Sequence, residues 1–420
     1  MNKLTRLLSL LLFSSVAIAD EPLSIETTLV DGEAIHGATF QSHNQKVVRN
    51  GRGIFMTHCR TRNAKMTAQQ WRLSWSRDGG QTFRTLFEAT DATNPPVLET
   101  DAHDNLYLGR PDFVNLEVVL YRFLAAEDYR EPHLTRVPKS AAGKYSMALD
   151  EPRGSIYFHS HSGIFIRFGL DGSVKSSTLL LKKGSEAVQE YPHLHLTLDG
   201  TLHTAWTSVF VPPEGRWTYW SIHHLQSLDG GESWRTFTGE PLTLPVAADE
   251  SAPSDRITLD DEFQPSTWLA NSLTKNAKTH FIYTARTDPP RHHHVRYDTA
   301  TGRRELDLAP EVRGQTLSLN LGGGFLATSQ RDASSPLFLI SLTAKAPVRI
   351  ACLRSDDNGT TWHDHAVSEP MKFPYALGGC REITPEGFVI GSFSEVINAA
   401  TNKQSQGRAH FFRIPVNRRR

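Results

Sequence analysis

Short runs of alternating apolar and polar residues, most of them opened by a turn, recur along the chain. They read GRGIFMTH (51–58), DNLYLGRP (104–111), RGSIYFHS (153–160), DGTLHTAW (199–206), AKTHFIYT (277–284), GGGFLATS (322–329) and EGFVIGSF (386–393). Alternation with a period of two is typical of half-buried strands, and Gly, Asn and Asp are typical of the turns between them. The AKTHFIYT copy lacks the glycine, and the copies are unevenly spaced, but together they indicate an internal repeat.

Each of these runs is preceded by another alternating run, as in PPVLETDAHDNLYL and YPHLHLTLDGTLHTAW. The two runs therefore form a hairpin around the turn. Several copies are followed by two further short strands. Four antiparallel strands in each repeat unit are the pattern of a propeller blade. We therefore predict an all-β fold, a seven-bladed β-propeller with four-stranded antiparallel blades.

A second motif, Ser-x-Asp-x-Gly-x-x-aromatic, occurs as SRDGGQTF (76–83), SLDGGESW (227–234) and SDDNGTTW (355–362). The Asp can accept hydrogen bonds from its own turn, and the Gly or Asn-Gly can take positive φ. The aromatic residue is expected to fold back as a plug. These turns resemble the Asp-box, or BNR, repeat of sialidases and related propellers, and we expect their Asp residues to be structural.

The chain opens with a basic start, an apolar run and the small-residue pattern Ala17-Ile18-Ala19. This is the pattern of a secretory signal peptide, residues 1–19, cut after Ala19, followed by a single propeller domain over residues 20–420. We expect a secreted or periplasmic protein, and no later run is apolar enough to cross a bilayer. The three cysteines lack zinc-type spacing, and Cys352 with Cys380 is the pair we would expect to bridge.

Charge is balanced, with 45 Lys+Arg against 45 Asp+Glu, which gives no reason to expect nucleic acid or a membrane surface as partner. We expect a monomer that requires no cofactor. The run RHHHVRYD (291–298) leaves a structural calcium or zinc ion open. However, adjacent residues on a strand point to opposite faces, so we interpret it as a solvated loop. His203 is expected to pack between blades, and His223-His224 to be structural or exposed.

In a propeller, the start of each first strand and the end of each second strand share one face. The starts are His43-Asn44, Asn94, Lys144-Tyr145, Tyr191 with His193, Trp268 with Asn271, Gln315 and Tyr375. The ends are His58 with Arg60, Arg110, His159 with His161, Thr207-Ser208, Arg286 and Arg331. This face collects His, Tyr, Lys, Arg and Asn with almost no carboxylates, which favours an anionic carbohydrate as ligand.

Hydrolysis of a glycosidic bond normally uses two carboxylates, and none stands at the predicted positions. β-Elimination of a uronate suits these residue types better. A cation neutralises the C5 carboxylate, a base removes the C5 proton and an acid protonates the leaving oxygen at C4. The sequence therefore predicts a lyase acting on an acidic polysaccharide.

A family resemblance supports this prediction. The segments KYSMALDEPRGSIYFHSHSG (144–163), YPHLHLTLDGTLHTAWTS (191–208) and WSIHHLQSLDGGESWRTFTGEPLTLP (220–245) resemble the BNR-repeat family that includes propeller-fold ulvan lyases. The resemblance is close over about 100 residues. It implies proton transfer by His161, or His159, and by Tyr191. It also implies an arginine that neutralises the uronate, but this sequence has Thr207 at that position.

Another blade must therefore supply the positive charge. We predict Lys144, with Arg216 next and Arg110 or Arg286 as alternatives. His161 is predicted as the base or its helper, and Tyr191 as the acid or base. The remaining predicted substrate-binding residues are His159, His193, His43, Asn44 and His58.

Two alternatives remain. A sialidase-like exo-glycosidase would fit the Asp-boxes. It would also need a tyrosine nucleophile with a glutamate partner and an acidic Asp, and FRIP (412–415) stands at the wrong end of the chain for that family. A non-catalytic carbohydrate-binding propeller is the second alternative, because fold does not dictate function.

Overall fold

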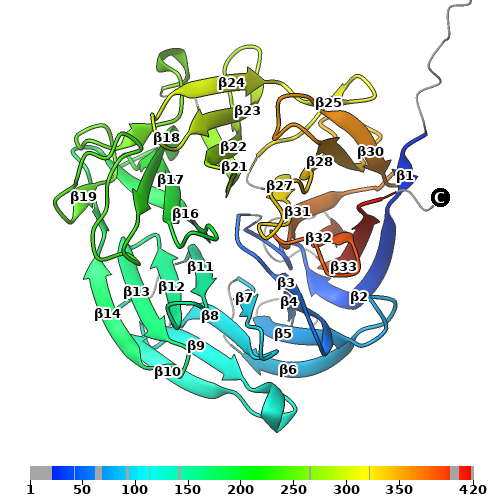
Figure 1. The fold of residues 1–420 in the computed structure, drawn as a ribbon. Helices are drawn as coiled ribbons and strands as arrows, with labels where there is room; N and C mark the ends of the chain where they lie inside the picture. The colour runs from blue at the N-terminus through cyan, green and yellow to red at the C-terminus, as the bar shows by residue number, and fades with distance from the viewer. Residues whose placement is uncertain are drawn as a thin grey trace, which may run out of the picture.

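The computed structural model describes residues 21–41, 43–61, 69–90, 94–112, 114–140, 143–263, 266–320, 322–397 and 406–417. Within these ranges the chain is built of strands, and the helical segments are two short 3-10 turns, η1 (Ala125–Glu127) and η2 (Asp260–Glu262). The sheets stand in a ring around a central axis (Figure 1). The prediction of an all-β protein is therefore confirmed.

Four of the sheets are antiparallel meanders of four strands, with the first strand nearest the axis (Figure 1). Two of them consist of β7 (Val97–Thr100), β8 (Leu106–Asp112), β9 (Glu117–Phe123) and β10 (His133–Pro138), and of β11 (Tyr145–Asp150), β12 (Ser155–Ser160), β13 (Ile164–Gly169) and β14 (Val174–Leu179). The other two consist of β16 (Ala187–Leu196), β17 (Leu202–Phe210), β18 (Thr218–Ser227) and β20 (Asp255–Arg256), and of β21 (Thr267–Lys275), β22 (Lys278–Ala285), β23 (Arg291–Asp298) and β24 (Arg304–Leu308). A short parallel pair, β15 (Leu181–Lys182) with β19 (Val246–Ala247), lies beside them.

Strands from near the two ends of the described chain meet in one eight-stranded sheet. Its strands are β31 (Pro374–Gly379), β32 (Phe388–Val396), β33 (Gln406–Pro415), β2 (Glu26–Ile35), β3 (Val47–Asn50), β4 (Gly53–Thr61), β5 (Gln69–Ser76) and β6 (Arg84–Thr90). β2 runs antiparallel to β33 along most of its length and meets β4 through the pair Ala34 and Arg60. The segments 21–35 and 410–416 therefore close the ring together.

The five-stranded sheet differs from one of the predicted hairpins. It runs from β27 (Gly324–Ala327) through β28 (Leu337–Leu342) and β29 (Ile350–Ser355) to β30 (His363–Val367), and β1 (Leu23–Ser24) adds to it in parallel. GGGFLATS was predicted as a second strand but forms the innermost strand β27. Gln315 lies instead in a small hairpin of β25 (Glu311–Val312) and β26 (Gln315–Thr316). The glycines at 322–324 imitate a hairpin turn in the sequence, which explains the error.

The Asp-box turns form as predicted. Asp229 accepts hydrogen bonds from the backbone N–H groups of Glu232, at 3.1 Å, and Ser233, at 2.9 Å. Gly230 and Gly231 take positive φ, 76° and 88°. The Asp78 and Asp357 carboxylates accept equivalent bonds. These Asp residues are therefore structural.

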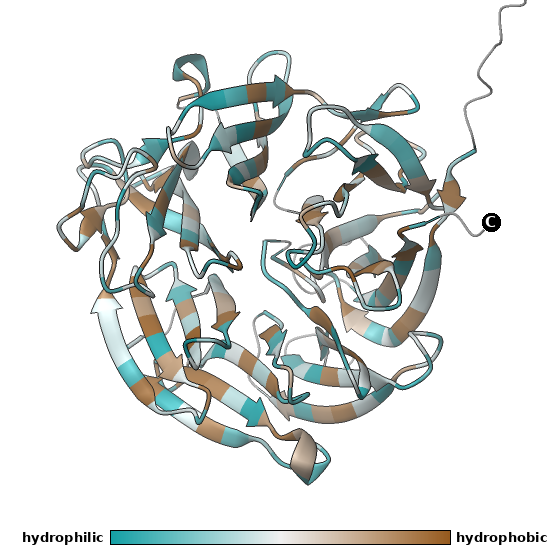
Figure 2. Ribbon diagram, in the orientation of Figure 1, coloured by the Kyte–Doolittle hydropathy of each residue, from teal (hydrophilic) through white to brown (hydrophobic). Residues whose placement is uncertain are grey.

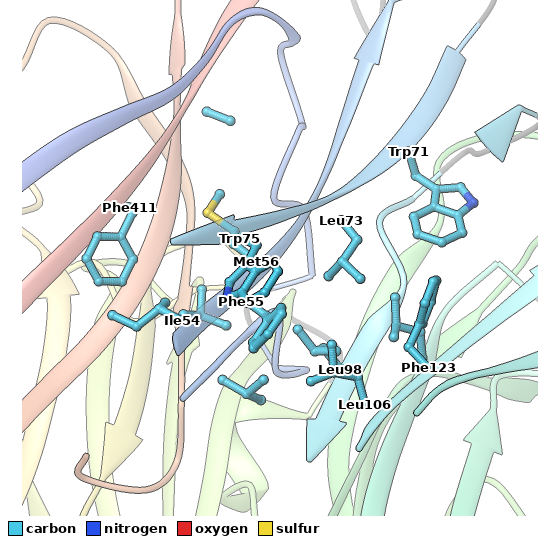
Figure 3. Packing of buried hydrophobic residues seen from close by; sticks show 14 of the residues in the cluster. Ile54, Phe55, Met56, Trp71, Leu73, Trp75, Leu98, Leu106, Phe123 and Phe411 are labelled. Carbon is cyan, nitrogen blue, oxygen red and sulfur yellow. The ribbon is translucent and has the colours of Figure 1, made fainter. Parts of the chain in front are cut away.

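The core lies between neighbouring sheets. One cluster joins Trp71 and Leu73 of β5 to Leu98, Leu106 and Phe123 of the next sheet (Figure 3). Along many strands hydrophobic and hydrophilic residues alternate (Figure 2), which is the period-two pattern of the sequence. The ring is therefore held together by packing between sheets.

Three further predictions can be compared with the structure. Cys59, Cys352 and Cys380 are all free and buried, so the predicted Cys352–Cys380 disulfide does not form. The predicted leader lies outside the described residues. Within the described residues, no helix has the length and apolar character needed to span a membrane.

Candidate active site

The two ends of the axis carry different chemistry. We call the end where the innermost strands begin and the second strands end the mouth, and the opposite end the hairpin-turn face. At the mouth, residues from β11, β12, β16 and β18 or next to them form a group of side chains. We call this group the Tyr191 cluster: Lys144, His161, Glu190, Tyr191 and Tyr219.

Tyr191 sits in a bulge of β16. Glu190 pairs with Thr207 and His193 with Ala205, so Tyr191 and Pro192 together face Trp206. Tyr191 has a φ of 52°, a left-handed conformation that costs roughly 1–2 kcal/mol in a residue with a side chain. Such strain is concentrated at functional sites. The bulge places the ring 5.8 Å from that of His43 and 6.2 Å from that of Tyr219.

Lys144 and Glu190 form an ion pair beside this ring. The Lys144 Nζ lies 3.3 Å from the Glu190 Oε2 and 5.5 Å from the centre of the Tyr191 ring. The Glu190 side chain is 3% exposed and that of Lys144 is 24% exposed. Burial raises the pKa of Glu190, and the Lys144 ammonium acts in the opposite direction. The mouth therefore contains a buried carboxylate, contrary to the expectation that it has none.

His161 is oriented by the backbone of the neighbouring strand. The Lys144 N–H donates to His161 Nδ1 at 3.0 Å, so the neutral ring carries its hydrogen on Nε2. Burial lowers the pKa of His161 to about 4, and the charge of Lys144 acts in the same direction. His161 is thus a neutral hydrogen-bond donor near pH 7, because neither ring nitrogen is free to accept a proton in this geometry.

Tyr219 and Trp268 extend the cluster toward the next sheet, with their rings 5.5 Å apart. The Arg286 guanidinium lies 3.9 Å from the centre of the Trp268 ring. Burial raises the pKa of Tyr219, whereas the charges of Arg216 and Arg286 lower it, so both arginines act at this hydroxyl. Both arginine side chains are exposed. One wall of the site is therefore aromatic and cationic.

Three predicted site residues lie elsewhere, with partners of their own. His159 is fully buried and hydrogen-bonds the Thr204 hydroxyl at 2.9 Å, between two sheets. His58 bonds Asp31 at 3.1 Å, next to the strand that closes the ring. Arg110 is buried and donates to the Tyr121 hydroxyl at 3.1 Å. These three hydrogen bonds stabilise the fold.

His43, Asn44 and His193 lie at the mouth, but two of them support a neighbouring strand. His43 Nε2, at 3.3 Å, and the Asn44 amide, at 2.8 Å, both bond the Tyr145 carbonyl. The His43 and His193 rings are 4.7 Å apart, and His193 is 2% exposed. Burial lowers the pKa of His193 to about 3. These three residues form the floor beneath the Tyr191 cluster.

The other histidines fill the sheets. His203 bonds His224 at 3.1 Å and is buried, as predicted. RHHHVRYD was expected to be a loop, but it forms strand β23. In it, His293 bonds Glu262 and Asp307, each at 2.7 Å, and His294 bonds His280 at 3.0 Å. Among the described residues, no group of three or more His, Cys, Asp or Glu side chains could hold a metal ion.

A cavity of about 1530 Å³ opens at the hairpin-turn face, away from the Tyr191 cluster. Its lining includes Asp150, Asp199 and Glu382. Arg331, expected at the mouth, lines this cavity instead, because the strand before it is the first of its sheet. The chemistry described above is at the mouth, where the strained tyrosine and the buried ion pair lie.

Glu190 and Tyr219 are the site residues that sequence reasoning missed. Glu190 directly precedes the Tyr-Pro pair, and the two-residue bulge brings it to the mouth. Tyr219 stands at the start of a third strand, a position outside the rule used for first and second strands. The sequence WTYW (217–220), rich in aromatic residues beside Arg216, was a signal that could have identified Tyr219.

A ring of antiparallel sheets, four of them four-stranded, with a polar site at one end of its axis defines the class, a β-propeller. No family model and no curated protein matches the chain. Among solved structures, it is similar to an ulvan lyase of polysaccharide lyase family PL25 bound to -[GlcA(1-4)Rha3S]-. The TM-score is 0.62 and the identity 10%, covering 91% of this chain and 95% of that one. Polysaccharide lyase Uly1 is similar with a TM-score of 0.57 and 10% identity, covering 92% of each chain. These likenesses show the fold.

Proposed function

We propose that the chain is a secreted polysaccharide lyase that cleaves a uronate-containing polysaccharide such as ulvan by β-elimination. The observation that carries the proposal is Tyr191, held in a strained bulge with its ring 6.2 Å from that of Tyr219, on whose hydroxyl the charges of Arg216 and Arg286 act. These groups match the proton transfer and charge neutralisation that elimination requires. The likeness to two polysaccharide lyases, one bound to a uronate-containing oligomer, supports the same chemistry.

The uronate carboxylate is best assigned to Arg216 and Arg286. Lys144 was the first candidate, but its ammonium pairs with Glu190, so the pair carries no net charge to offer a substrate. Arg216 and Arg286 are exposed, and both charges act on the Tyr219 hydroxyl. Binding of the carboxylate there makes the C5 proton more acidic, because the charge that develops on the substrate is stabilised.

His161 and Tyr191 then take different roles. His161 Nε2–H donates a hydrogen bond to the uronate and so acts as the helper instead of the base, since Nδ1 is occupied by the Lys144 N–H. Tyr191 acts as a phenolate that takes the proton from C5 and returns it to O4 of the leaving sugar. The C5–H bond breaks, its electrons form the C4=C5 double bond, and the C4–O4 bond breaks to release a protonated hydroxyl. The product is an unsaturated uronate.

The proposal also covers the number of blades and the repeat family. If the eight-stranded sheet is divided at its narrow Ala34–Arg60 junction, the ring has seven blades, six of four strands and one to which β1 adds a fifth. Three Asp-box turns support the proposal that the chain is a BNR-repeat propeller. The aromatic residue of each turn packs against the preceding blade. Trp234, for example, packs on Phe165 with ring centres 5.4 Å apart.

The test is the ultraviolet absorbance of the unsaturated product, measured with ulvan, glucuronan, alginate, pectate and glycosaminoglycans. Wild-type protein should produce absorbance with at least one polymer, and Tyr191→Phe should lower the rate by about 10²-fold or more. Tyr297→Phe is the matched control, because its buried hydroxyl bonds the Ile257 carbonyl away from the cluster. Lack of product from every polymer, or an unchanged rate in Tyr191→Phe, would contradict the proposal.

Glu190 favours a second candidate, a sialidase-like exo-glycosidase. A tyrosine with a nearby glutamate is the nucleophile arrangement of that chemistry, and Glu190 is a buried carboxylate that acts electrostatically on both Tyr191 and Tyr219. Hydrolysis would release reducing sugar without ultraviolet absorbance, and Glu190→Gln would abolish it. Binding of a polymer with neither product would favour the carbohydrate-binding alternative.

A further inference from the structure

Five aromatic rings follow one another across the mouth. We call this series the aromatic track: Trp268, Tyr219, Tyr191, Phe40 and Tyr375. The centres of successive rings lie 5.5, 6.2, 6.3 and 6.1 Å apart. Tyr191, in the middle of the track, is 7% exposed, and the other four side chains are each partly exposed. The track therefore continues aromatic surface beyond the strained tyrosine in two directions.

The track passes from one side of the axis to the other. Tyr191 is on β16 and Tyr375 is on β31, and these innermost strands lie on opposite sides of the axis (Figure 1). Phe40 joins them, because its ring meets that of Tyr191 edge-on, at 84°, and stacks on that of Tyr375, at 7°. The proposed function places a uronate carboxylate beside Arg286, at the Trp268 end, and assigns no ligand to the Phe40–Tyr375 end.

Phe40 is held in place by the residues on either side of it. The Thr39 hydroxyl donates to the Ala376 carbonyl at 2.8 Å, and the Gln41 amide donates to the Gly143 carbonyl at 2.9 Å. Thr39 and Gln41 are both buried. The segment that carries Phe40 is thus attached to two different sheets, so the ring is positioned before any ligand arrives and little ordering is needed on binding.

The chemistry of the two ends of the track differs. Among the described residues, the cations that lie over rings of the track are Lys144, over Tyr191, and Arg286, over Trp268. The parallel rings of Phe40 and Tyr375 offer an apolar surface instead. The C–H groups on the face of a sugar ring can pack against such a surface while the hydroxyl groups of the sugar remain hydrated. The Phe40–Tyr375 end therefore suits a sugar ring better than a carboxylate.

We propose that Phe40 and Tyr375 form a second sugar-binding subsite, which holds a sugar of the polysaccharide beyond Tyr191 from the Trp268 end of the track. The inference rests on the proposed function, because it takes the polysaccharide as the ligand of the mouth. A chain that lies along the track passes Tyr191 with sugars bound on either side of the bond to be cleaved. The site is therefore built for a chain of several sugars and not for a single terminal sugar.

The experiment compares Tyr375→Ala, Tyr375→Phe and Leu198→Ala on the polysaccharide that wild-type protein cleaves. In Tyr375→Ala, KM should rise about 5- to 10-fold with kcat nearly unchanged, because the lost contact binds substrate and transition state alike. Tyr375→Phe keeps the ring and should remain close to wild type. Leu198→Ala is the control and should have no effect, since Leu198 is an exposed apolar residue of the hairpin-turn face.

A direct binding measurement separates the subsite from a merely structural role. Calorimetric titration in the Tyr191→Phe background, where cleavage is slowed, gives the dissociation constant for each polymer of the ultraviolet panel. Adding Tyr375→Ala or Phe40→Ala to this background should weaken binding by the same 5- to 10-fold. If Phe40→Ala instead lowers kcat and leaves the affinity unchanged, Phe40 only positions Tyr191, and the subsite is overturned.

The outcomes also distinguish the subsite from the lyase function. If wild-type protein binds a polymer without cleaving it, and both alanine variants weaken that binding, the lyase function fails and the subsite stands. If wild-type protein cleaves a polymer but Tyr375→Ala keeps its KM and its affinity, only the subsite is overturned. If wild-type protein neither binds nor cleaves any polymer of the panel, both proposals fail.

Discussion

At the scale of single residues, burial decides what each group of the Tyr191 cluster can do. Glu190 is almost completely enclosed, yet it keeps a partner in Lys144, and His161 is fixed in one tautomer by a backbone N–H. The placement of Lys144 and His161 at the mouth could be predicted from the sequence because they flank the ends of β11 and β12, whereas Tyr191, predicted at a strand start, lies in a bulge within β16. The placement of Glu190 could not be predicted, because a simple alternation of sides breaks down at the Tyr191-Pro192 bulge.

The Lys144–Glu190 pair gives a stability prediction. Lys144→Met leaves a buried carboxylate without its cation, which should lower the free energy of unfolding by about 1–3 kcal/mol near neutral pH. The partial exposure of Lys144 keeps the loss below that of a fully buried pair. The penalty should shrink in mildly acidic buffer, where Glu190 can take a proton.

Urea unfolding of Lys144→Met and of Lys144→Met/Glu190→Gln checks this prediction. The double variant carries no unpaired charge and should recover most of the loss. If the double variant is no more stable than the single one, the ion pair does not account for the effect.

At the scale of elements, local patterns were predictable and pairings between distant segments were not. The hairpins of β11–β12, β16–β17 and β21–β22 follow from alternation and turn residues within a short stretch. β27 was misassigned because its true partner, β28, lies beyond the nine-residue loop 328–336. The pairing of β2 with β33 depends on segments from opposite ends of the chain, so no local signal distinguishes it.

The Asp-box turns should be sensitive to loss of their carboxylates. In Asp229→Ala the N–H groups of Glu232 and Ser233 lose their acceptor, and Trp234 loses the turn that presses it onto Phe165. We expect a loss of about 1–3 kcal/mol in the free energy of unfolding. Glu240→Ala, an exposed position after the same turn, is the control and should change stability little. Equal unfolding midpoints for the two variants would contradict the structural role.

At the scale of the whole molecule, the burial of neutral histidines makes the ring sensitive to acid. Burial lowers the pKa values of His159, His193 and His294 each to about 3, and that of His161 to about 4. An unfolded histidine has a pKa of about 6.5, so the unfolded chain binds more protons than the folded one below that pH. Their stabilising contribution is complete above about pH 6.5 and is lost as the pH falls toward the folded values.

The free energy of unfolding should therefore fall steadily from about pH 6.5 to about pH 4.5, before the low-pKa carboxylates are protonated. His293 acts in the opposite sense. It bonds Glu262 and Asp307, its pKa is raised, and its contribution is lost as the pH rises through the folded value. The contribution of His293 to the free energy of unfolding cannot offset those of the four buried histidines whose pKa values are lowered. Urea unfolding across this pH range is the measurement, and a flat profile would contradict the prediction.

The pairing of β2 with β33 also determines how the molecule could be rewired. Since the ends of the described chain lie in one sheet, a short linker from residue 417 to residue 21 would span neighbouring strands. New termini could then be opened in an exposed loop between two sheets, and the resulting circular permutant would keep every strand in its native neighbourhood. In the permutant, β33 and β2 would form one continuous hairpin. Closure of the ring would then depend on a local strand pairing instead of a pairing between segments from opposite ends of the sequence.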